Sequence, residues 1–179
     1  MAEIIKYGIS YDPDLWDRLD TAIDRKDPQL GRLIHRSIAI KNEIVLQDLK
    51  ESNLRKVLNF GHTIGHAIES YYLNHQVLAS LTHGEAIGIG MIVEAYLSHR
   101  LFEFPLEKVQ VLKEKIIALY GKTTIEKSAY EDILEFAKHD KKNIGQTLKF
   151  VLLESIGVPK IDCEVDQTLL IEGLNYYAS

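Results

Sequence analysis

Cysteine is nearly missing from this sequence: Cys163 is the only one among 179 residues. A single thiol cannot close an internal disulfide. Long apolar runs are missing too, since the longest, Ala86–Val93, is far shorter than the roughly 18 residues that a membrane span needs. The opening Met1-Ala2-Glu3 does not start a basic segment that leads into an apolar one, as a secretory signal would. We therefore expect a cytoplasmic protein that binds no membrane, and we interpret Ala86–Val93 as buried helix.

Positive charge is also scarce. Lysine and arginine total 21 against 26 aspartate and glutamate residues, which gives a formal net charge of −5 and a pI near 5.8. Nucleic-acid binders present a basic face, so this balance argues against nucleic acid as a partner. The sequence has no repeat, no low-complexity segment and no Gly/Ser linker. With 179 residues, of which 46% are hydrophobic, it can bury one good core, and we predict a single domain over residues 1–179.

Helical patterns fill most of the chain. Asp12-Pro13 and Asp27-Pro28 each place an acidic cap before a proline, an arrangement that opens a helix. Strand patterns flank Gly157-Val158-Pro159 near the carboxyl terminus. We predict a mainly α fold with a small β-hairpin near residues 147–165. The expected helices are residues 13–24, 28–47, 54–72, 83–100, 105–120, 128–138 and 166–177, and the expected strands are residues 147–153 and 160–165.

Three histidines stand in segments that otherwise have the pattern of buried helix. His62 and His66 are four residues apart, so on a helix their rings share a face and can converge on one ion. Two hydrogen-bonded core histidines would give the same pattern. A zinc-protease motif is excluded, because Thr63 stands where that motif needs a glutamate. His83, at an expected helix start, favours a binding site, since it adds an imidazole and free backbone N–H groups.

Charged side chains elsewhere could complete such a site. A catalytic metal has about three protein ligands and an open position, and Glu3 is the best candidate for the third. Glu3 and Lys6 share a helical face, although a surface ion pair would give the same spacing. Lys41 lies near the apolar edge of the expected helix 28–47. The alternative there is a lysine stem that runs along the core with its ammonium in water.

Four blocks together resemble the 3-dehydroquinate synthase family, in the same order, over about residues 2–157. They are Ala2–Gly8, Lys41 with Arg55–His66, His83–Ala86, and Asp140–Lys142. The resemblance covers only the carboxy-terminal half of that enzyme. It implies a dehydroquinate synthase-like carboxy-terminal helical domain. It also implies that the family's amino-terminal NAD-binding α/β domain is absent from this chain, where Gly84, Gly88 and Gly90 lack the strand and the third glycine of a dinucleotide fingerprint.

The resemblance further implies an activity. The family converts 3-deoxy-D-arabino-heptulosonate 7-phosphate to 3-dehydroquinate and phosphate, a step of the shikimate pathway toward chorismate and the aromatic amino acids. It uses NAD and a divalent metal, zinc or cobalt. We expect a homodimer for the full-length enzyme and no activity from this chain alone. Two alternatives stay open: the same half of a related sugar phosphate cyclase or metal-dependent polyol dehydrogenase, and a non-enzymatic helical domain with structural histidines.

Site residues carry over position by position. The resemblance assigns Glu3, His62 and His83 to the metal. It places His66 near the transferring protons and the phosphate, and gives Lys6 and Asn59 catalytic roles. The residues it assigns to substrate binding are Lys41, Arg55, Asn59, Lys141 and Lys142.

Two departures from the family pattern affect the neighbouring loops. Leu49 and Asn53 replace an acidic residue and a glycine, and we expect Asn53 to preserve the turn because asparagine tolerates a left-handed conformation. The interval from His62 to His83 is longer than is common. We expect the extra residues to enlarge the loop around Asn74 and to leave both ligands in place.

Overall fold

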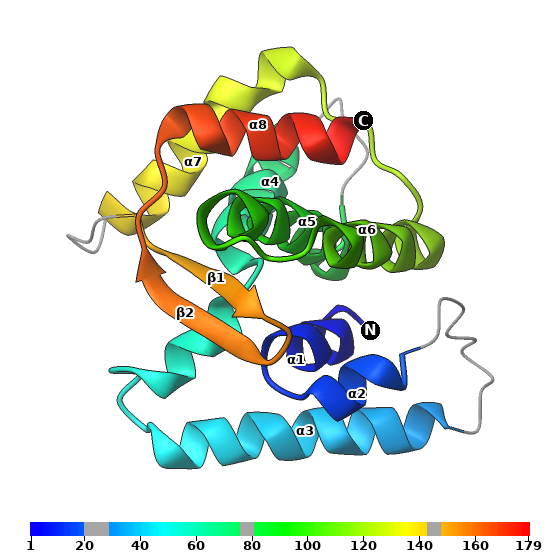
Figure 1. Cartoon of the computed structure of the whole chain (residues 1–179). Coiled ribbons are helices and arrows are strands. Elements are labelled where there is room, and N and C mark those ends of the chain that lie inside the picture. The colour runs from blue at the N-terminus through cyan, green and yellow to red at the C-terminus, as the bar shows by residue number, and fades with distance from the viewer. Residues whose placement is uncertain (20–28, 76–80, 143–147) are drawn as a thin grey trace.

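The computed structural model describes residues 1–19, 29–75, 81–142 and 148–179, without the side chains of residues 139–142. Within these ranges the fold is mainly helical with one antiparallel hairpin, so the predicted fold class is confirmed (Figure 1). None of the described helices is long and apolar enough to cross a membrane. The α-helices are α1 Ala2–Ser10, α2 Pro13–Asp17, α3 Leu30–Gln47, α4 His62–Asn74, α5 His83–Phe102, α6 Leu106–Tyr120, α7 Tyr130–Lys142 and α8 Gln167–Ala178; the 3-10 helices are η1 Leu54–Asn59 and η2 Lys127–Ala129; the strands are β1 Phe150–Ser155 and β2 Val158–Cys163.

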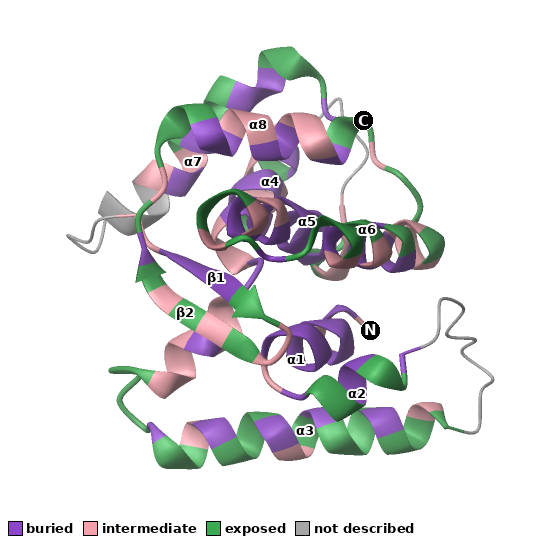
Figure 2. Ribbon diagram, viewed as in Figure 1, coloured by how far each residue is buried: buried purple, intermediate pink, exposed green. Residues whose placement is uncertain are grey.

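Helix α5 is the centre of the core. It packs against α1, α4, α6, α8 and β1, and nearly every residue from Ala86 to Ser98 is buried (Figure 2). A helix that is apolar on all sides must be enclosed by other elements. The expected buried helix at Ala86–Val93 is therefore confirmed. In contrast, α3 lies along the outer edge below α1 and buries only one stripe of residues: Leu33, Ser37, Ile40 and Ile44.

Helix ends follow from local capping. The Asp12 side chain accepts a hydrogen bond from the Leu15 N–H at 3.1 Å, so the predicted cap before Pro13 is confirmed. Helix α5 begins with a capping box, in which Thr82 and Glu85 each bond the other's backbone N–H. This box places His83 in the first turn, as expected. Helix α6 ends where the sequence predicts, at Gly121.

The hairpin contacts the first helix of the chain. Strands β1 and β2 pair antiparallel from Phe150 with Cys163 to Ser155 with Val158, a few residues from the predicted strands. Gly157, in the turn, has φ 78° and donates its N–H to the Ile9 carbonyl at 2.9 Å. The tip of the hairpin therefore closes on the end of α1 (Figure 1).

Four predicted features need correction or fall outside the described residues. The expected helix 54–72 is wrong as a single element: it consists of η1 and α4, separated at Phe60-Gly61, where Gly61 has φ 79°. Phe60 is the C-cap of η1, and the left-handed Gly61 is the N-cap of α4, so the chain changes direction between the two helices. The helix expected at 13–24 ends at Asp17. The Asp27-Pro28 cap and Thr147 lie outside the described residues.

Candidate metal and substrate site

The histidine-bearing helices α4 and α5 cross at unusually close range. A Cβ atom built at Gly90 would overlap the Gly61 carbonyl oxygen and lie 2.7 Å from the Gly65 nitrogen. A Cβ at Gly65 would lie 2.9 Å from the Ile87 Cα. Real side chains do not reach such distances, so glycine is required for this backbone-to-backbone contact. The crossing brings the amino-terminal halves of α4 and α5 together, and these halves carry the three histidines.

Three imidazoles meet at this crossing. The ring centroids are 5.3 Å apart for His62 and His66, 5.9 Å for His62 and His83, and 5.7 Å for His66 and His83. One ligand nitrogen from each ring lies within 4.8 Å of the others. Imidazole nitrogen is a good ligand for zinc and cobalt, so the donor set fits a divalent ion. His66 and His83 are exposed, and His62 is half-buried.

Glu3 stands at the edge of this cluster. Its Oε1 lies 3.9 Å from His62 Nε2, while Lys6 Nζ lies 2.9 Å from Oε1 and the Tyr7 hydroxyl donates to Oε2 at 2.7 Å. Burial raises the pKa of Glu3, but the charge and hydrogen bond of Lys6, with Tyr7 and His62, outweigh it and lower the pKa overall. The carboxylate is therefore ionised beside the imidazoles.

Lys6 is a buried residue, so the alternative of a surface ion pair with Glu3 is wrong. Its side chain is only 2% exposed, and Nζ also donates to the Leu58 carbonyl at 2.7 Å. Burial lowers the pKa of Lys6, Glu3 opposes this shift, and Lys41 adds to it. An ammonium group with two acceptors in a buried place is unusual and marks a candidate functional group.

His62 is held in its neutral form. Burial, and then the positive charge of Lys6, lowers its pKa to about 4. Its Nδ1 lies 3.1 Å from the Phe60 carbonyl. If Nδ1 carries the proton and donates it there, Nε2 is the free ligand atom, and Nε2 is the nitrogen that faces Glu3. His83 has a similar arrangement, since its Nδ1 lies 3.2 Å from Glu69 Oε2 on α4.

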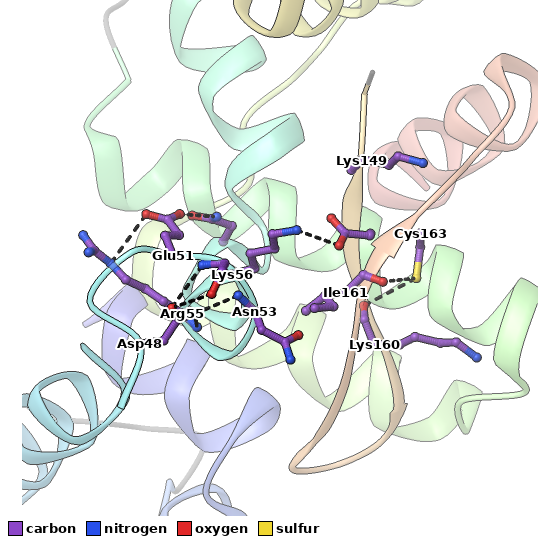
Figure 3. A network of polar contacts seen from close by, with 12 residues as sticks. Asp48, Glu51, Asn53, Arg55, Lys56, Lys149, Lys160, Ile161 and Cys163 are labelled. Atoms are coloured by element: carbon purple, nitrogen blue, oxygen red, sulfur yellow. Dashed lines mark hydrogen bonds and ion pairs between the residues drawn. The ribbon is translucent and has the colours of Figure 1, made fainter. Parts of the chain in front are cut away.

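The segment that leads to α4, residues 48–59, holds several predicted substrate-binding groups; we call it the Asp48 segment (Figure 3). The Asp48 carboxylate accepts backbone N–H bonds from Ser52 at 3.0 Å, Asn53 at 2.8 Å and Arg55 at 3.0 Å. These bonds, led by that from Arg55, lower the pKa of Asp48. The left-handed residue here is Glu51, with φ 53°, and not Asn53, with φ −149°. The turn therefore forms differently from our expectation.

Glu51 is a residue that the sequence reasoning missed. Its carboxylate accepts a hydrogen bond from Asn59 Nδ2 at 3.2 Å and pairs with Arg55 Nε at 3.5 Å (Figure 3). Arg55 also donates to the Leu49 carbonyl at 3.3 Å. The sequence does contain a signal for this contact: Glu51 is an acidic residue four positions before Arg55 and eight before Asn59.

The remaining predicted residues are less closely joined. Lys41 is exposed on α3, although its charge reaches Lys6. Lys141 and Lys142 are the last residues of α7, and their side chains lie outside the described part of the chain. The structure thus brings together Glu3, Lys6 and the three histidines, and separately joins Arg55 with Asn59 through Glu51.

Comparison with known proteins identifies the family. Residues 1–143 match the family described as 3-dehydroquinate synthase C-terminal. The chain belongs to this family. The 3-dehydroquinate synthase of Parabacteroides distasonis is 36% identical over 181 residues, covering 98% of this chain and 50% of the relative. That of Methylacidiphilum infernorum is 42% identical over 161 residues, covering 89% and 43%. The chain therefore spans about half the length of the curated relatives that it matches.

Solved structures of this enzyme group share the fold. A 2-deoxy-scyllo-inosose synthase complexed with carbaglucose-6-phosphate, NAD+ and Co2+ matches with a TM-score of 0.76 at 28% identity, over 98% of this chain and 50% of that one. The 2-epi-5-epi-valiolone synthase of Streptomyces hygroscopicus subsp. jinggangensis, with NAD+ and Zn2+ bound, matches with a TM-score of 0.83 at 20% identity, over 99% and 49%. The second likeness concerns the fold alone.

Proposed function

We propose that this chain is the metal- and substrate-binding half of a 3-dehydroquinate synthase about twice its length, which we call the complete protein. The observation that carries the proposal is the cluster of His62, His66 and His83 beside the ion pair that the buried Lys6 forms with the partly exposed Glu3. The names and lengths of the relatives support it. The reaction is the conversion of 3-deoxy-D-arabino-heptulosonate 7-phosphate to 3-dehydroquinate and phosphate. Residues 1–179 would form one domain, and an amino-terminal domain would bind most of the NAD.

Glu3, His62 and His83 are our proposed ligands for a divalent ion, zinc or cobalt. When bound, such an ion polarises substrate oxygens and stabilises negative charge on them. Glu3 contributes an anionic ligand near His62, and the neutral state of His62 is the state that binds metals. The structure also allows a second set, His62, His66 and His83, because those nitrogens are the closer group.

The other residues act on the substrate. We assign His66 to proton transfer, because its exposed ring lies beside the proposed ligands. Lys6 lies within hydrogen-bonding distance of Glu3 and provides a positive charge at the same place. Arg55 suits a planar carboxylate through two parallel hydrogen bonds, whereas Lys41, Lys141 and Lys142 suit a phosphate. Asn59 would bind substrate hydroxyls. Asn59 and Arg55 would then give up their contacts with Glu51 and contact the substrate instead.

A related sugar phosphate cyclase is the second candidate. The 28% identity to a 2-deoxy-scyllo-inosose synthase that holds carbaglucose-6-phosphate favours it. Both candidate activities need positively charged side chains that bind the substrate phosphate and a metal ion that binds vicinal hydroxyls. They differ in the carboxylate, which the heptulosonate carries and a hexose phosphate lacks. Arg55, as the proposed carboxylate partner, is thus the residue that favours the first candidate.

Substrate profiling of the complete protein tests the proposal. With NAD and Co2+ or Zn2+, we expect phosphate release from 3-deoxy-D-arabino-heptulosonate 7-phosphate and formation of 3-dehydroquinate. A hexose 6-phosphate should give at least 100-fold less turnover, because discrimination of a group that the site is built to bind is large. The 179-residue chain alone should give none, because it would lack the amino-terminal domain that we propose binds most of the NAD. Faster turnover of the hexose phosphate would establish the second candidate.

A further inference from the structure

Glu94 is a buried acidic residue in the middle of α5. It is 0% exposed and stands between the fully buried Val93 and Ala95. Both of its carboxylate oxygens accept backbone N–H bonds from the start of α4: Oε2 from Gly61 at 2.7 Å and Oε1 from Ile64 at 3.4 Å. The side chain of one helix therefore satisfies the first amides of another.

Helix α4 needs this external cap. Its N-cap residue is Gly61, which has no side chain to bond the free amides of the first turn. Nor could another residue replace Gly61, because its φ is 79° and a Cβ there would overlap Met91 Cγ and lie 2.9 Å from the Met91 nitrogen. The close crossing of α4 and α5 thus excludes an ordinary cap, and Glu94 supplies the acceptors from across the crossing. The positive end of the α4 dipole also favours a negative group there.

A buried carboxylate is a costly way to join two helices. An apolar residue at position 94 would avoid the desolvation penalty of a charged group but would leave the amides of Gly61 and Ile64 unpaired. Glu94 therefore stabilises the start of α4, and the place of the two bonded amides gives this cap a second consequence. Gly61 and Ile64 flank His62, and the residue before Gly61, Phe60, provides the carbonyl 3.1 Å from His62 Nδ1.

We propose that Glu94 is a positioning residue for His62. By holding the amides of Gly61 and Ile64, it fixes the backbone on which His62 stands and the Phe60 carbonyl that orients the ring. Glu94 itself touches neither ion nor substrate. This inference rests on the proposed function, because it takes His62 as a metal ligand. Residues that orient a metal ligand without touching the ion typically raise the affinity for the metal 10- to 100-fold.

The test compares Glu94 with Ser98, one turn further along α5. Ser98 is also 0% exposed, and its hydroxyl donates to the Glu94 carbonyl at 2.7 Å and accepts from the Leu153 N–H at 2.9 Å, on the side of the hairpin. Ser98→Ala thus removes these two buried hydrogen bonds, whose partners lie on α5 and β1 and not on α4. Glu94→Ala removes both bonds to α4, and Glu94→Gln keeps one carbonyl acceptor in the same volume.

Three measurements are made on the complete protein: Co2+ affinity from its visible absorption, thermal unfolding, and amide exchange of residues 60–66 without metal. We expect Glu94→Ala to weaken Co2+ binding by roughly 10- to 100-fold and Glu94→Gln by less. Both substitutions should increase the rate of amide hydrogen exchange at Gly61 and Ile64. Ser98→Ala should lower Tm while leaving Co2+ affinity within about twofold of wild type and the exchange of residues 60–66 unchanged, because it acts on stability alone. If Glu94→Ala does not fold, the same comparison is made with Glu94→Gln.

The outcomes separate this inference from the proposed function. Loss of Co2+ in His62→Ala, with unchanged affinity in the folded Glu94 variants, would overturn the positioning role alone. Equal weakening in the Glu94 variants and in Ser98→Ala would also overturn it, since the effect would then be one of general stability. Failure of the wild-type protein to bind Co2+ in stoichiometric amount would overturn the metal site itself, and this inference with it.

Discussion

The α4–α5 crossing and the Asp48 segment are built in opposite ways, although they adjoin in sequence. At the crossing, glycines let two backbones touch, and the bonded carboxylate of Glu94 is fully buried. In the Asp48 segment, Glu51, Ser52 and Asn53 are exposed, and the turn is held by hydrogen bonds to Asp48 (Figures 2 and 3). Packing determines the position of the first region, and a polar network determines that of the second.

The difference matches what each region is proposed to bind. A metal ion accepts ligand distances within a few tenths of an ångström, so its histidines belong on elements that packing fixes. An anionic substrate is reached by long side chains that can exchange one partner for another. Arg55 and Asn59 already share an acidic partner, Glu51, which a substrate carboxylate or hydroxyl could replace. Substitutions in one region should therefore leave the other region as a control.

Removal of an imidazole at the crossing should have the largest effect. In the complete protein, His83→Ala should abolish stoichiometric binding of Zn2+ or Co2+, because one of about three protein ligands is lost. His75→Ala is the matched control, since His75 follows the other end of α4 and stacks on Tyr71, with ring centroids 4.1 Å apart. Metal content of dialysed protein measures both. A tightly held ion in His83→Ala would contradict the ligand assignment.

The same measurement distinguishes the two possible ligand sets. Glu3→Ala should also lose the ion, while His66→Ala should keep it and lose turnover, because we assign His66 to proton transfer. Retention of the ion in Glu3→Ala, together with its loss in His66→Ala, would instead support the set of three histidines.

Arg55 is the residue to change in the Asp48 segment. Arg55→Ala in the complete protein should reduce kcat/KM by an amount equivalent to roughly 2 to 5 kcal/mol, because it removes a charge-assisted pair with the substrate. Metal content should stay at one ion per chain. Lys56→Ala is the control, since Lys56 points to the hairpin and pairs with Asp162 at 2.7 Å (Figure 3). Equal kcat/KM in Arg55→Ala and wild type would show that Arg55 does not bind substrate.

A methyl group added at position 90 tests how strongly packing fixes the distance between α4 and α5. Gly90→Ala should lower the free energy of unfolding by about 3 kcal/mol, since the added Cβ meets backbone atoms of Gly61 and Gly65 that cannot move aside. Gly31→Ala, on α3, has no atom within 4 Å of the new Cβ and should stabilise the chain slightly. Denaturant titration measures both. Similar unfolding curves for the two variants would show that the crossing tolerates separation.

The smallest expected effect comes from the polar network. Asp48→Ala removes the acceptor of three backbone N–H groups, and it should raise KM severalfold by loosening the segment that carries Arg55. Metal content and kcat should change little, because the crossing is held independently. A loss of bound metal in this variant would show that the two regions are not separate.

Local signals predicted the ends of elements better than their breaks. The cap at Asp12 and the stop at Gly121 lie in the sequence beside the helices that they limit. The break at Gly61 was not predicted, because an isolated glycine is tolerated within a helix and its positive φ depends on the close approach of Met91. The burial of Lys6 could not be predicted from the sequence either, because one of its hydrogen-bond acceptors, the Leu58 carbonyl, lies far along the chain.

The candidate site was predicted in part for the same reason. Spacing alone placed His62 and His66 on one face, but their meeting with His83 depends on the crossing. Spacing made Glu3 a candidate, and the resemblance to the family assigned Glu3 to the metal and Arg55 to the substrate. It did not lead us to Glu51, whose left-handed backbone and shared bonds appear only when the segment is folded.

The hydrogen bond between Gly157 and Ile9 has a consequence for the order of folding. On the ribosome, α1 is made before the hairpin that closes on it. Until the hairpin has formed, the end of α1 lacks the contact that Gly157 makes with the Ile9 carbonyl. Contacts between such distant segments form slowly, and exposed apolar helices of nascent chains are targets for chaperones and for aggregation. Glu3 stands on the same helix, so the helix that carries this proposed ligand gains its contact with the hairpin only after the hairpin has left the ribosome.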